Sequence, residues 1–299
     1  MPDVVILTLR DSRHGPGEGC VCGADEKGCG DDDRPRVPVL ECADALREER
    51  LSVDLVTARD EHEIDAALKV EGRLVVAAAS DAELRAVVRR LVRRHAPPPS
   101  KRPAELPPNR TMFDLPPLAV LPLSPAVPDL VTRLGLPASP KDVATAVVSQ
   151  KIQRYDLLRT DSGSVTLNGA LIGGVAEGEL VPWRGRVEVD DAVLTDGGEP
   201  VLACAVRNVG SSDVDGLPLV VDAVPDDGRV EVAVAVPLMK RRLLRQAAVS
   251  YEVRRAVGRA VSVLPHGTDV RYVDDGVSTT LSRKRSWWVE AGAWGAYVM

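Results

Sequence analysis

Aromatic residues and long apolar runs are scarce in this chain of 299 residues. Aromatic residues make up 3% of the sequence, with a single Phe, so the cores must be built from Val, Leu and Ala. No stretch reaches the roughly 20 apolar residues of a membrane-spanning helix. The N-terminus lacks the basic-then-apolar order of a signal peptide. These absences predict a soluble, cytoplasmic protein.

An excess of positive charge is also missing. Lys and Arg number 38 against 44 Asp and Glu, which gives a net charge of -6. This balance excludes a nucleic-acid binder driven by its overall charge. The hydrophobic share of 44% is enough for one large domain or two medium domains with real cores.

Cysteines are few and unevenly placed, with four near the N-terminus and one alone: Cys20, Cys22, Cys29, Cys42 and Cys204. Without an export signal, disulfides are not expected. The first three cysteines and His14 are candidate zinc ligands, but their spacing departs from a C-x2-C pair and an acidic run follows. We therefore favour a flexible insertion with free thiols over zinc at Cys20, Cys22 and Cys29.

The first part of the sequence alternates apolar strands with helices. Strands are expected at 3–9, 51–58, 73–79 and 116–123, and helices at 37–49, 60–68 and 80–95. This alternation predicts a parallel sheet covered by helices on both faces. The Pro-rich stretch 96–110 lies between the helix expected at 80–95 and the strand expected at 116–123, and its composition is typical of a loop or linker.

The second part is rich in strands and poor in helices. From residue 152 to about 236, short strands are separated by turns with Gly, Asp and Pro, and a basic, loosely amphipathic segment at 238–257 interrupts them. We predict a fold of the α/β plus all-β class: a parallel-sheet α/β domain over 1–123 and an antiparallel β-sandwich domain over 124–283. The last segment, 284–299, can return to the first domain.

Four stretches in a fixed order resemble one known family. They are "LPLSPAVPDLVTRLGLP", "IQRYDLLRTDSGSVTLNGALIGG", "GLPLVVDAVPDDGRVEVAVA" and "VRYVDDG". Together they are similar to the diacylglycerol kinase catalytic family, lipid kinases that share a fold with NAD kinase. The resemblance implies two domains, ATP and Mg in the cleft between them, and phosphorylation of a lipid hydroxyl.

The phosphate-binding turn of that family departs most from its pattern here. The Gly-Gly-Asp-Gly-Thr turn matches Ala-Ser-Asp-Ala-Glu at 79–83, so only Asp81 is kept. Ser80 and Glu83 have the S-x-x-E spacing of a capping box, which uses N–H groups that would otherwise bind phosphate. A carboxylate beside a phosphate also costs about 1–4 kcal/mol at surface-like dielectric constants. The sequence therefore predicts a turn closed to phosphate.

The resemblance also assigns roles residue by residue. Asp81 and Asp275 take the catalytic positions, with Asp275 as general base on the lipid hydroxyl. The positions that contact nucleotide are Ser80, Asp81, Glu83, Ser124, Asp129 and Asn168. The alternative for Asp275 is an aspartate of a β-turn, in the sequence "DDG". Asp226 and Asp227 have two interpretations, a structural metal site or a turn, and we favour the turn.

Two functions remain open. The first is a divergent ATP-dependent lipid kinase with reduced activity. The second is a catalytically inactive pseudokinase that binds a ligand or another protein. The expected partner is a lipid or other small molecule, not nucleic acid. The basic run that begins at Lys240 has two interpretations, a peripheral contact with a membrane or a face exposed to solvent, and we favour the second. A homodimer is also left open.

Overall fold

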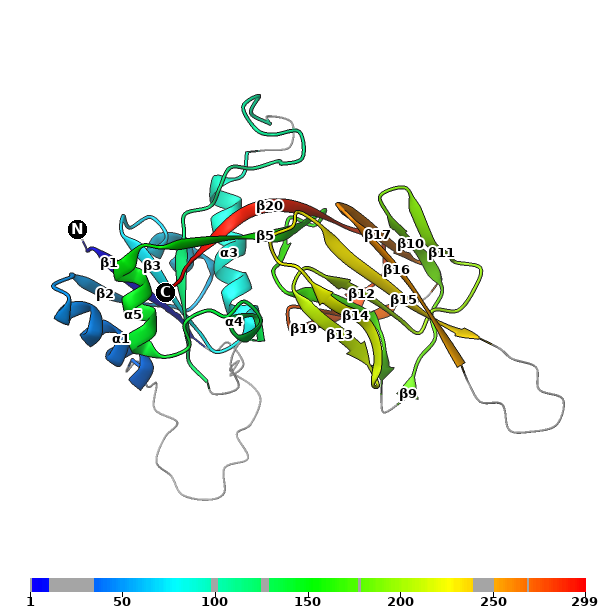
Figure 1. Ribbon diagram of the computed structural model, residues 1–299, viewed down its shortest axis with the longest axis horizontal. Coiled ribbons are helices and arrows are strands. Elements are labelled where there is room, and N and C mark those ends of the chain that lie inside the picture. Colours follow the sequence, from blue (N-terminus) through cyan, green and yellow to red (C-terminus); the bar gives the residue numbers. More distant parts are fainter. Residues whose placement is uncertain are drawn as a thin grey trace, which may run out of the picture.

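The computed structural model describes residues 2–10, 35–97, 102–124, 129–176, 179–238, 250–267 and 269–299. The zinc alternative at Cys20, Cys22 and Cys29 lies outside these residues. Figure 1 shows two halves side by side, a helical half that contains the N-terminus and a half built of strands.

A parallel sheet with helices forms the first half. Its elements are β1 (Val4–Leu9), α1 (Val37–Glu48), β2 (Val53–Ala58), α2 (Glu61–Ala67), β3 (Arg73–Ala78), α3 (Asp81–His95), β4 (Leu118–Pro122), α4 (Asp129–Arg133) and α5 (Pro140–Ser149). The strand order is β2-β1-β3-β4, with all neighbours parallel. Neighbouring residues of β1 point to opposite faces of the sheet: Leu7 packs with α2 and α3, and Ile6 packs with α1 and α5. Both faces of the sheet are therefore covered.

The second half consists of strands. They are β5 (Ile152–Thr160), β6 (Val165–Thr166), β7 (Gly169–Gly173), β8 (Val175–Ala176), β9 (Glu179–Leu180), β10 (Gly185–Val189), β11 (Ala192–Asp196), β12 (Ala203–Arg207), β13 (Gly210–Val214), β14 (Leu217–Ala223), β15 (Val230–Leu238), β16 (Ser250–Gly258), β17 (Ala260–Pro265), β18 (Val270–Asp274), β19 (Val277–Leu281) and β20 (Arg285–Tyr297). The sheet β16-β15-β12-β7-β18-β19 packs against β10, β17 and β20 around Trp287.

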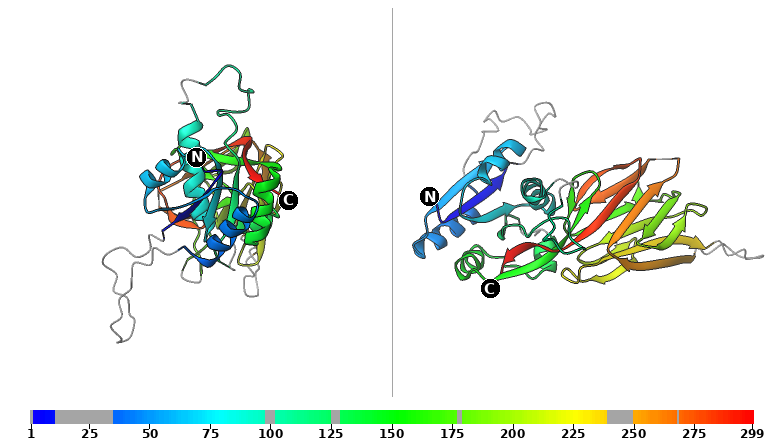
Figure 2. Two further views of the ribbon diagram at one scale, coloured as in Figure 1. Left: turned by 90° about the vertical axis from the view of Figure 1, so that its left-hand side faces the viewer. Right: turned by 90° about the horizontal axis from the view of Figure 1, so that it is seen from above.

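Strand β20 joins the two halves. It pairs antiparallel with β5 from Trp287 to Tyr297, pairs with β17 at its start, and meets β4 in parallel where Ala296 lies opposite Leu118. One sheet of ten strands therefore runs through both halves, and Figure 2 shows β20 in red passing between them. The predicted fold class, a parallel α/β part followed by an antiparallel sandwich, is confirmed.

One expectation about secondary structure was wrong. Residues 250–257 do not continue a basic amphipathic interruption but lie in β16, which pairs with β15 from Val230 opposite Gly258 to Leu238 opposite Ser250. The charged side chains on this strand have local partners: Arg254 pairs with Glu199, and Arg255 donates to the carbonyl of Leu219. Among the described residues, none of the helices combines the length and the apolar character that crossing a membrane requires.

A buried carboxylate fixes the β5–β20 pair. Asp156 in β5 is 1% exposed and accepts hydrogen bonds from the backbone N–H groups of Gly228, at 2.6 Å, and Gly292, at 2.7 Å. Gly292 has a φ of 60° and lies where the register of β20 shifts between Glu290 and Trp294. Burial raises the pKa of Asp156, whereas the two N–H donors lower it. The carboxylate thus stabilises an irregular segment of the strand that joins the halves.

We expect Asp156→Ala to lower the free energy of unfolding by about 2–4 kcal/mol, because it leaves two part-buried N–H groups without their acceptor and removes a buried side chain. Urea unfolding followed by Trp fluorescence measures this loss. Asp226→Ala is the matched control, since that exposed carboxylate contacts only the Gln153 amide, at 3.2 Å, among the described residues. It should change stability by less than about 0.5 kcal/mol. Equal losses in the two variants would contradict the role of Asp156.

Candidate functional site

The turn between β3 and α3 uses its own side chains to satisfy its N–H groups. Ser80 is the N-cap of α3, with φ -157° and ψ 160°, and its hydroxyl accepts from the N–H of Glu83 at 3.4 Å. The Glu83 carboxylate turns back and accepts from the N–H of Ala79 at 2.7 Å. The capping interaction predicted from the sequence is present, with Glu83 reaching one residue further back than Ser80.

The same device begins the neighbouring helix. Asp60 caps α2 by accepting from the N–H of Glu63 at 2.8 Å, and the Glu63 carboxylate accepts from the N–H of Arg59 at 2.7 Å. Two successive strand-to-helix turns thus have one hydrogen-bond pattern. The turn after β3 is therefore built as an ordinary capped helix start.

Beneath this turn, Asp81 belongs to a buried polar network. It is 9% exposed, and its carboxylate accepts from the side-chain amide of Asn168 at 3.1 Å and from the N–H of Leu130 at 3.2 Å. Asn168 precedes β7, and Leu130 lies in the short helix α4. Asp81 therefore ties the turn after β3 to both α4 and the strand-rich half.

Asp275 lies in the same network, with its carboxylate enclosed. It has a φ of 46°, is 3% exposed, and accepts from the N–H groups of Leu167, Asn168 and Gly169 at 2.7, 2.9 and 3.0 Å. Burial and the adjacent charge of Asp274 raise the pKa of Asp275 to about 7, against the opposite effect of the N–H donors. In this arrangement the carboxylate closes the turn at 167–169, and its role as general base remains a prediction.

Arg85 is a member of this network that the sequence analysis missed. From the first turns of α3 its guanidinium donates to the carbonyls of Val165, at 2.7 Å, and Asp274, at 3.0 Å, and to the hydroxyl of Ser164, at 3.0 Å. It also lies 3.0 Å from the Asp274 carboxylate. The available signal was a basic residue one helical turn after Asp81, a spacing that puts both side chains on the same face of the helix.

The Asp274 carboxylate has further partners of its own. It is 2% exposed and accepts from the hydroxyls of Thr166, at 2.7 Å, and Tyr272, at 2.5 Å. Burial raises the pKa of Asp274, and the positive charge of Arg85 opposes this rise. Arg85 and Asp274 thus form an ion pair between α3 and the end of β18, in which the aspartate is buried and the arginine is partly exposed.

A second missed arginine connects this network to a depression beside α4. Arg207 donates to the side-chain oxygen of Asn168 at 2.7 Å and to the carbonyl of Val209 at 2.9 Å. The depression has a volume of about 400 Å³. Its lining residues come from α4, from β13 and β14, and from the chain beside these strands: Arg133, Val209, Gly210, Ser211, Val221, Asp222, Ala223 and Pro225.

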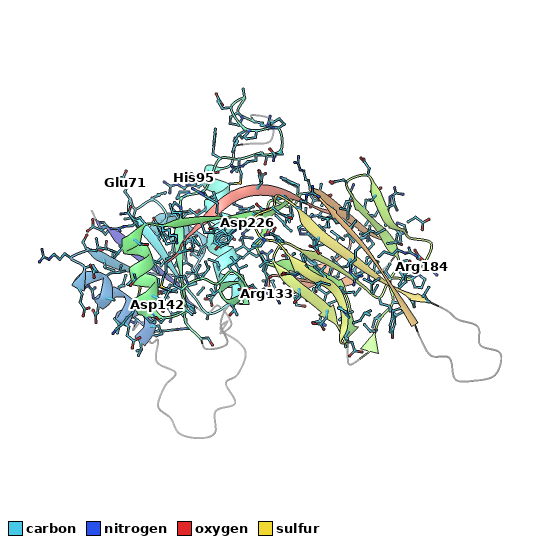
Figure 3. All side chains as sticks on the ribbon, viewed as in Figure 1. Glu71, His95, Arg133, Asp142, Arg184 and Asp226 are labelled. Atoms are coloured by element: carbon cyan, nitrogen blue, oxygen red, sulfur yellow. The ribbon has the colours of Figure 1, made fainter. Side chains whose placement is uncertain are left out.

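Arg133 lines this depression and is labelled in Figure 3, where the two halves meet. It donates to the carbonyl of Ser211 at 2.8 Å. Gly210, with a φ of 61°, leaves room for it, because a Cβ there would lie 2.5 Å from the guanidinium. The depression therefore offers a cation and a carboxylate, Asp222, beside apolar side chains.

The remaining predicted site residues lie in two places. Ser124 is half-buried after β4, where the N–H of Leu123 donates to the carbonyl of Ala78 at 2.9 Å, so it shares a sheet edge with the turn after β3. Residues 125–128 and the side chain of Asp129 lie outside the described part.

Asp226 and Asp227 lie apart, in the turn before β15. Asp227 accepts from the N–H of Arg229 at 2.9 Å, a short-range bond typical of an aspartate turn. Within the described ranges, no group of three or more His, Cys, Asp or Glu side chains is arranged to hold a metal ion. The metal alternative at these two residues remains a prediction.

Comparison with known proteins gives matches to solved structures. Neither a protein-family model nor a curated sequence matches the chain. A putative diacylglycerol kinase from Bacillus anthracis str. Sterne is similar, with a TM-score of 0.62 and 14% identity over 100% of this chain and 98% of that one. A diacylglycerol kinase from the same strain gives a TM-score of 0.58 and 12% identity over 100% and 97%. This chain has a diacylglycerol kinase-like fold.

The diacylglycerol kinase-like fold is shared more widely. An NAD kinase from Archaeoglobus fulgidus in complex with ATP has a TM-score of 0.51 and 12% identity, over 98% of this chain and 93% of that one. The resemblance drawn from the four sequence stretches is therefore confirmed at the level of the fold. One fold can support many functions, so the function of this protein depends on its site residues.

Asp275 makes the stability of this fold depend on pH. In the unfolded chain the carboxyl ionises near 3.8, whereas in the folded protein its pKa is raised to about 7. Between these values the folded state binds more protons, so the free energy of unfolding falls as the pH rises. Asp275→Asn should remove about 1.4 kcal/mol per pH unit of this slope between about pH 5 and pH 7.

Chemical denaturation at several pH values measures both slopes. Asp226→Asn should leave the slope unchanged, because that carboxylate lies outside the network. A slope in Asp275→Asn equal to that of the unmodified protein would show that Asp275 is ionised throughout this range.

Proposed function

We propose that this protein is a lipid kinase-like protein in which phosphoryl transfer from ATP is lost or strongly reduced, and which uses the fold to bind a ligand. The observation that carries the proposal is the 2.7 Å hydrogen bond from the N–H of Ala79 to the Glu83 carboxylate. A phosphate-binding turn needs N–H groups that point at the ligand without another acceptor. Here the side chain of the same turn is that acceptor.

Charge and volume act in the same direction as this bond. The Glu83 carboxylate stands where the resemblance would put a nucleotide phosphate, and two like charges in contact repel by about 1–4 kcal/mol at surface-like dielectric constants. Ala79, Ser80 and Ala82 also carry Cβ atoms at the three glycine positions of the family turn. Each Cβ restricts positive φ and occupies space near the backbone.

The two retained acids support the proposal in a second way. A general base must come within hydrogen-bond reach of the proton that it removes. Asp275 is buried under three N–H donors, and Asp81 accepts from Asn168 and Leu130. Both carboxylates thus stabilise the junction between the halves. To contact a substrate, either carboxylate would have to give up these hydrogen bonds, and the new contacts would have to offset that loss.

The depression beside α4 is the place we propose for the ligand. It combines the Arg133 guanidinium and the Asp222 carboxylate with the apolar side chains of Val209 and Val221. Pockets of this mixed kind hold small molecules with an apolar body and a polar head. A lipid or another amphipathic small molecule has that chemistry.

Residual lipid kinase activity is the second candidate. It is favoured by the retention of Asp81 and Asp275 in a fold that matches putative diacylglycerol kinases over its whole length. In that case Asp81 would hold Mg²⁺, which neutralises phosphate charge during transfer. Asn168 would position Asp81, and the Asp275 carboxyl would accept the proton of the lipid hydroxyl.

Calorimetric titration with ATP·Mg tests the proposal on three proteins. The unmodified protein should show no saturable binding below millimolar ATP. Ala79→Gly/Ser80→Gly/Glu83→Thr should bind at least about tenfold more tightly, because it restores free N–H groups and removes the repulsion. Glu83→Gln is the matched control: its carbonyl oxygen still accepts from Ala79, but the charge is gone.

The three results separate the causes. Binding by the triple variant alone assigns the block to the occupied N–H groups, and binding by Glu83→Gln as well assigns it to charge. Phosphate binding elsewhere on the surface contributes equally to all three proteins and cancels in the comparison. Micromolar ATP·Mg binding by the unmodified protein, accompanied by shifts of the Ala79 and Ser80 amide signals in NMR spectra, would refute a closed turn and favour the residual kinase.

A further inference from the structure

A basic groove lies between α2 and α3, outside the site described above. It has a volume of about 380 Å³. Its lining residues come from α2, the turn that follows it, and α3: His62, Asp65, Lys69, Arg90, Arg93 and Arg94. The lining thus contains one lysine and three arginines against one carboxylate.

The groove is separate from the turn after β3. Arg90 to Arg94 lie nine to thirteen residues after Asp81 along α3, which at 1.5 Å per residue is roughly 15 Å away. Figure 3 labels His95 at this end of α3, and Arg133 lies beside the other end. A ligand in the basic groove would therefore contact neither the capped turn nor the buried network.

Two of the arginines are held in place by their neighbours. The guanidinium of Arg90 donates to Asp65 at 2.7 Å and to Glu61 at 2.5 Å. Arg94 donates to the carbonyl of Leu68, the C-cap residue of α2, at 2.9 Å. Guanidinium groups fixed in this way present their remaining donors in a defined direction, which suits the oxygens of a phosphate.

The other two cations are poorly neutralised. The Lys69 ammonium forms no hydrogen bond or ion pair with any residue in the described ranges, and Arg93 has only a 3.4 Å contact with Glu61. Glu61 is already shared, since it also pairs with Arg89 and Arg90. Within a chain of net charge -6, this leaves a local excess of positive charge.

This excess works against the stability of the helix itself. Arg89 with Arg93 and Arg90 with Arg94 are like-charge pairs four residues apart, which destabilise a helix. Burial and the neighbouring arginines lower the pKa of Arg89. The helix dipole favours cations only in the last turn, so it does not account for Arg89 and Arg90. An anion in the groove would relieve the repulsion.

We propose that the basic groove between α2 and α3 binds a phosphate group, carried either by a soluble phosphorylated molecule or by the headgroup of an anionic lipid. Both sources offer the same oxygens to the guanidinium and ammonium donors. This inference does not depend on the ligand or the activity proposed above, because no residue is shared between the two sites.

The test uses the full chain and two probes. Inorganic pyrophosphate is titrated by calorimetry, and vesicles of phosphatidylglycerol with phosphatidylcholine are compared with phosphatidylcholine alone by co-sedimentation. The groove variant is Lys69→Glu/Arg93→Glu, which changes the two exposed cations with the fewest partners and leaves Arg90 and Arg94 in place. The matched control is Lys141→Glu/Arg229→Glu, an equal change of charge at exposed residues elsewhere. Thermal unfolding verifies that all proteins fold.

We expect the groove variant to bind at least about tenfold more weakly and the control to stay within about twofold of the unmodified protein. Groove-dependent binding of pyrophosphate alone assigns the phosphate to a soluble molecule. Groove-dependent binding to phosphatidylglycerol vesicles assigns it to a lipid headgroup. Absence of both interactions in the unmodified protein at low salt, or equal weakening in the control, would overturn the proposal.

Discussion

The antiparallel pairing of β5 with β20 is the contact on which the rest of the molecule depends. It extends from Thr160 opposite Trp287 to Ile152 opposite Tyr297, and it links the parallel strands of the first half to the sandwich of the second. Because β20 is the last strand of the chain, the shared sheet needs residues from both ends of the sequence. The buried Asp156 carboxylate maintains this pairing where the register of β20 shifts.

The same pairing brings the polar turns of the second half over the start of α3. There the polar side chains of the network, among them the predicted site residues Asp81, Asn168 and Asp275, bond to one another and to the backbone. Asp81 binds Asn168, Arg85 binds Asp274, and Asp275 binds three N–H groups. Buried polar groups are costly unless they are paired, so these bonds are a coherent way to stabilise the junction. These bonds support the proposal that phosphoryl transfer is lost or strongly reduced.

Local features of the fold could be predicted from the sequence. The alternation of strands and helices identified the parallel half, and the S-x-x-E spacing identified the cap made by Ser80 and Glu83. Both depend on residues within a few positions of one another. The family resemblance also gave the fold class, because the order of its segments is kept even where their motifs are lost.

Contacts across the sequence could not be predicted in the same way. Arg85 reads as one more basic residue of an amphipathic helix, yet it bonds Asp274, which lies 189 residues away. Strand β16 contains enough arginine to resemble a surface segment, and only its pairing with β15 makes it a strand. Nothing in the sequence pointed to Arg207, because its partner Asn168 lies before β7, far from it along the chain.

The central claim is that the turn after β3 is closed to phosphate by its own glutamate. Backbone amide NMR tests it most directly, through the signals of Ala79 and Ser80 as ATP·Mg is added. A hydrogen-bonded Ala79 N–H should exchange slowly with solvent, and its signal should stay in place at millimolar ATP·Mg. Fast exchange of that amide, together with a saturable shift on addition of ATP·Mg, would contradict this account.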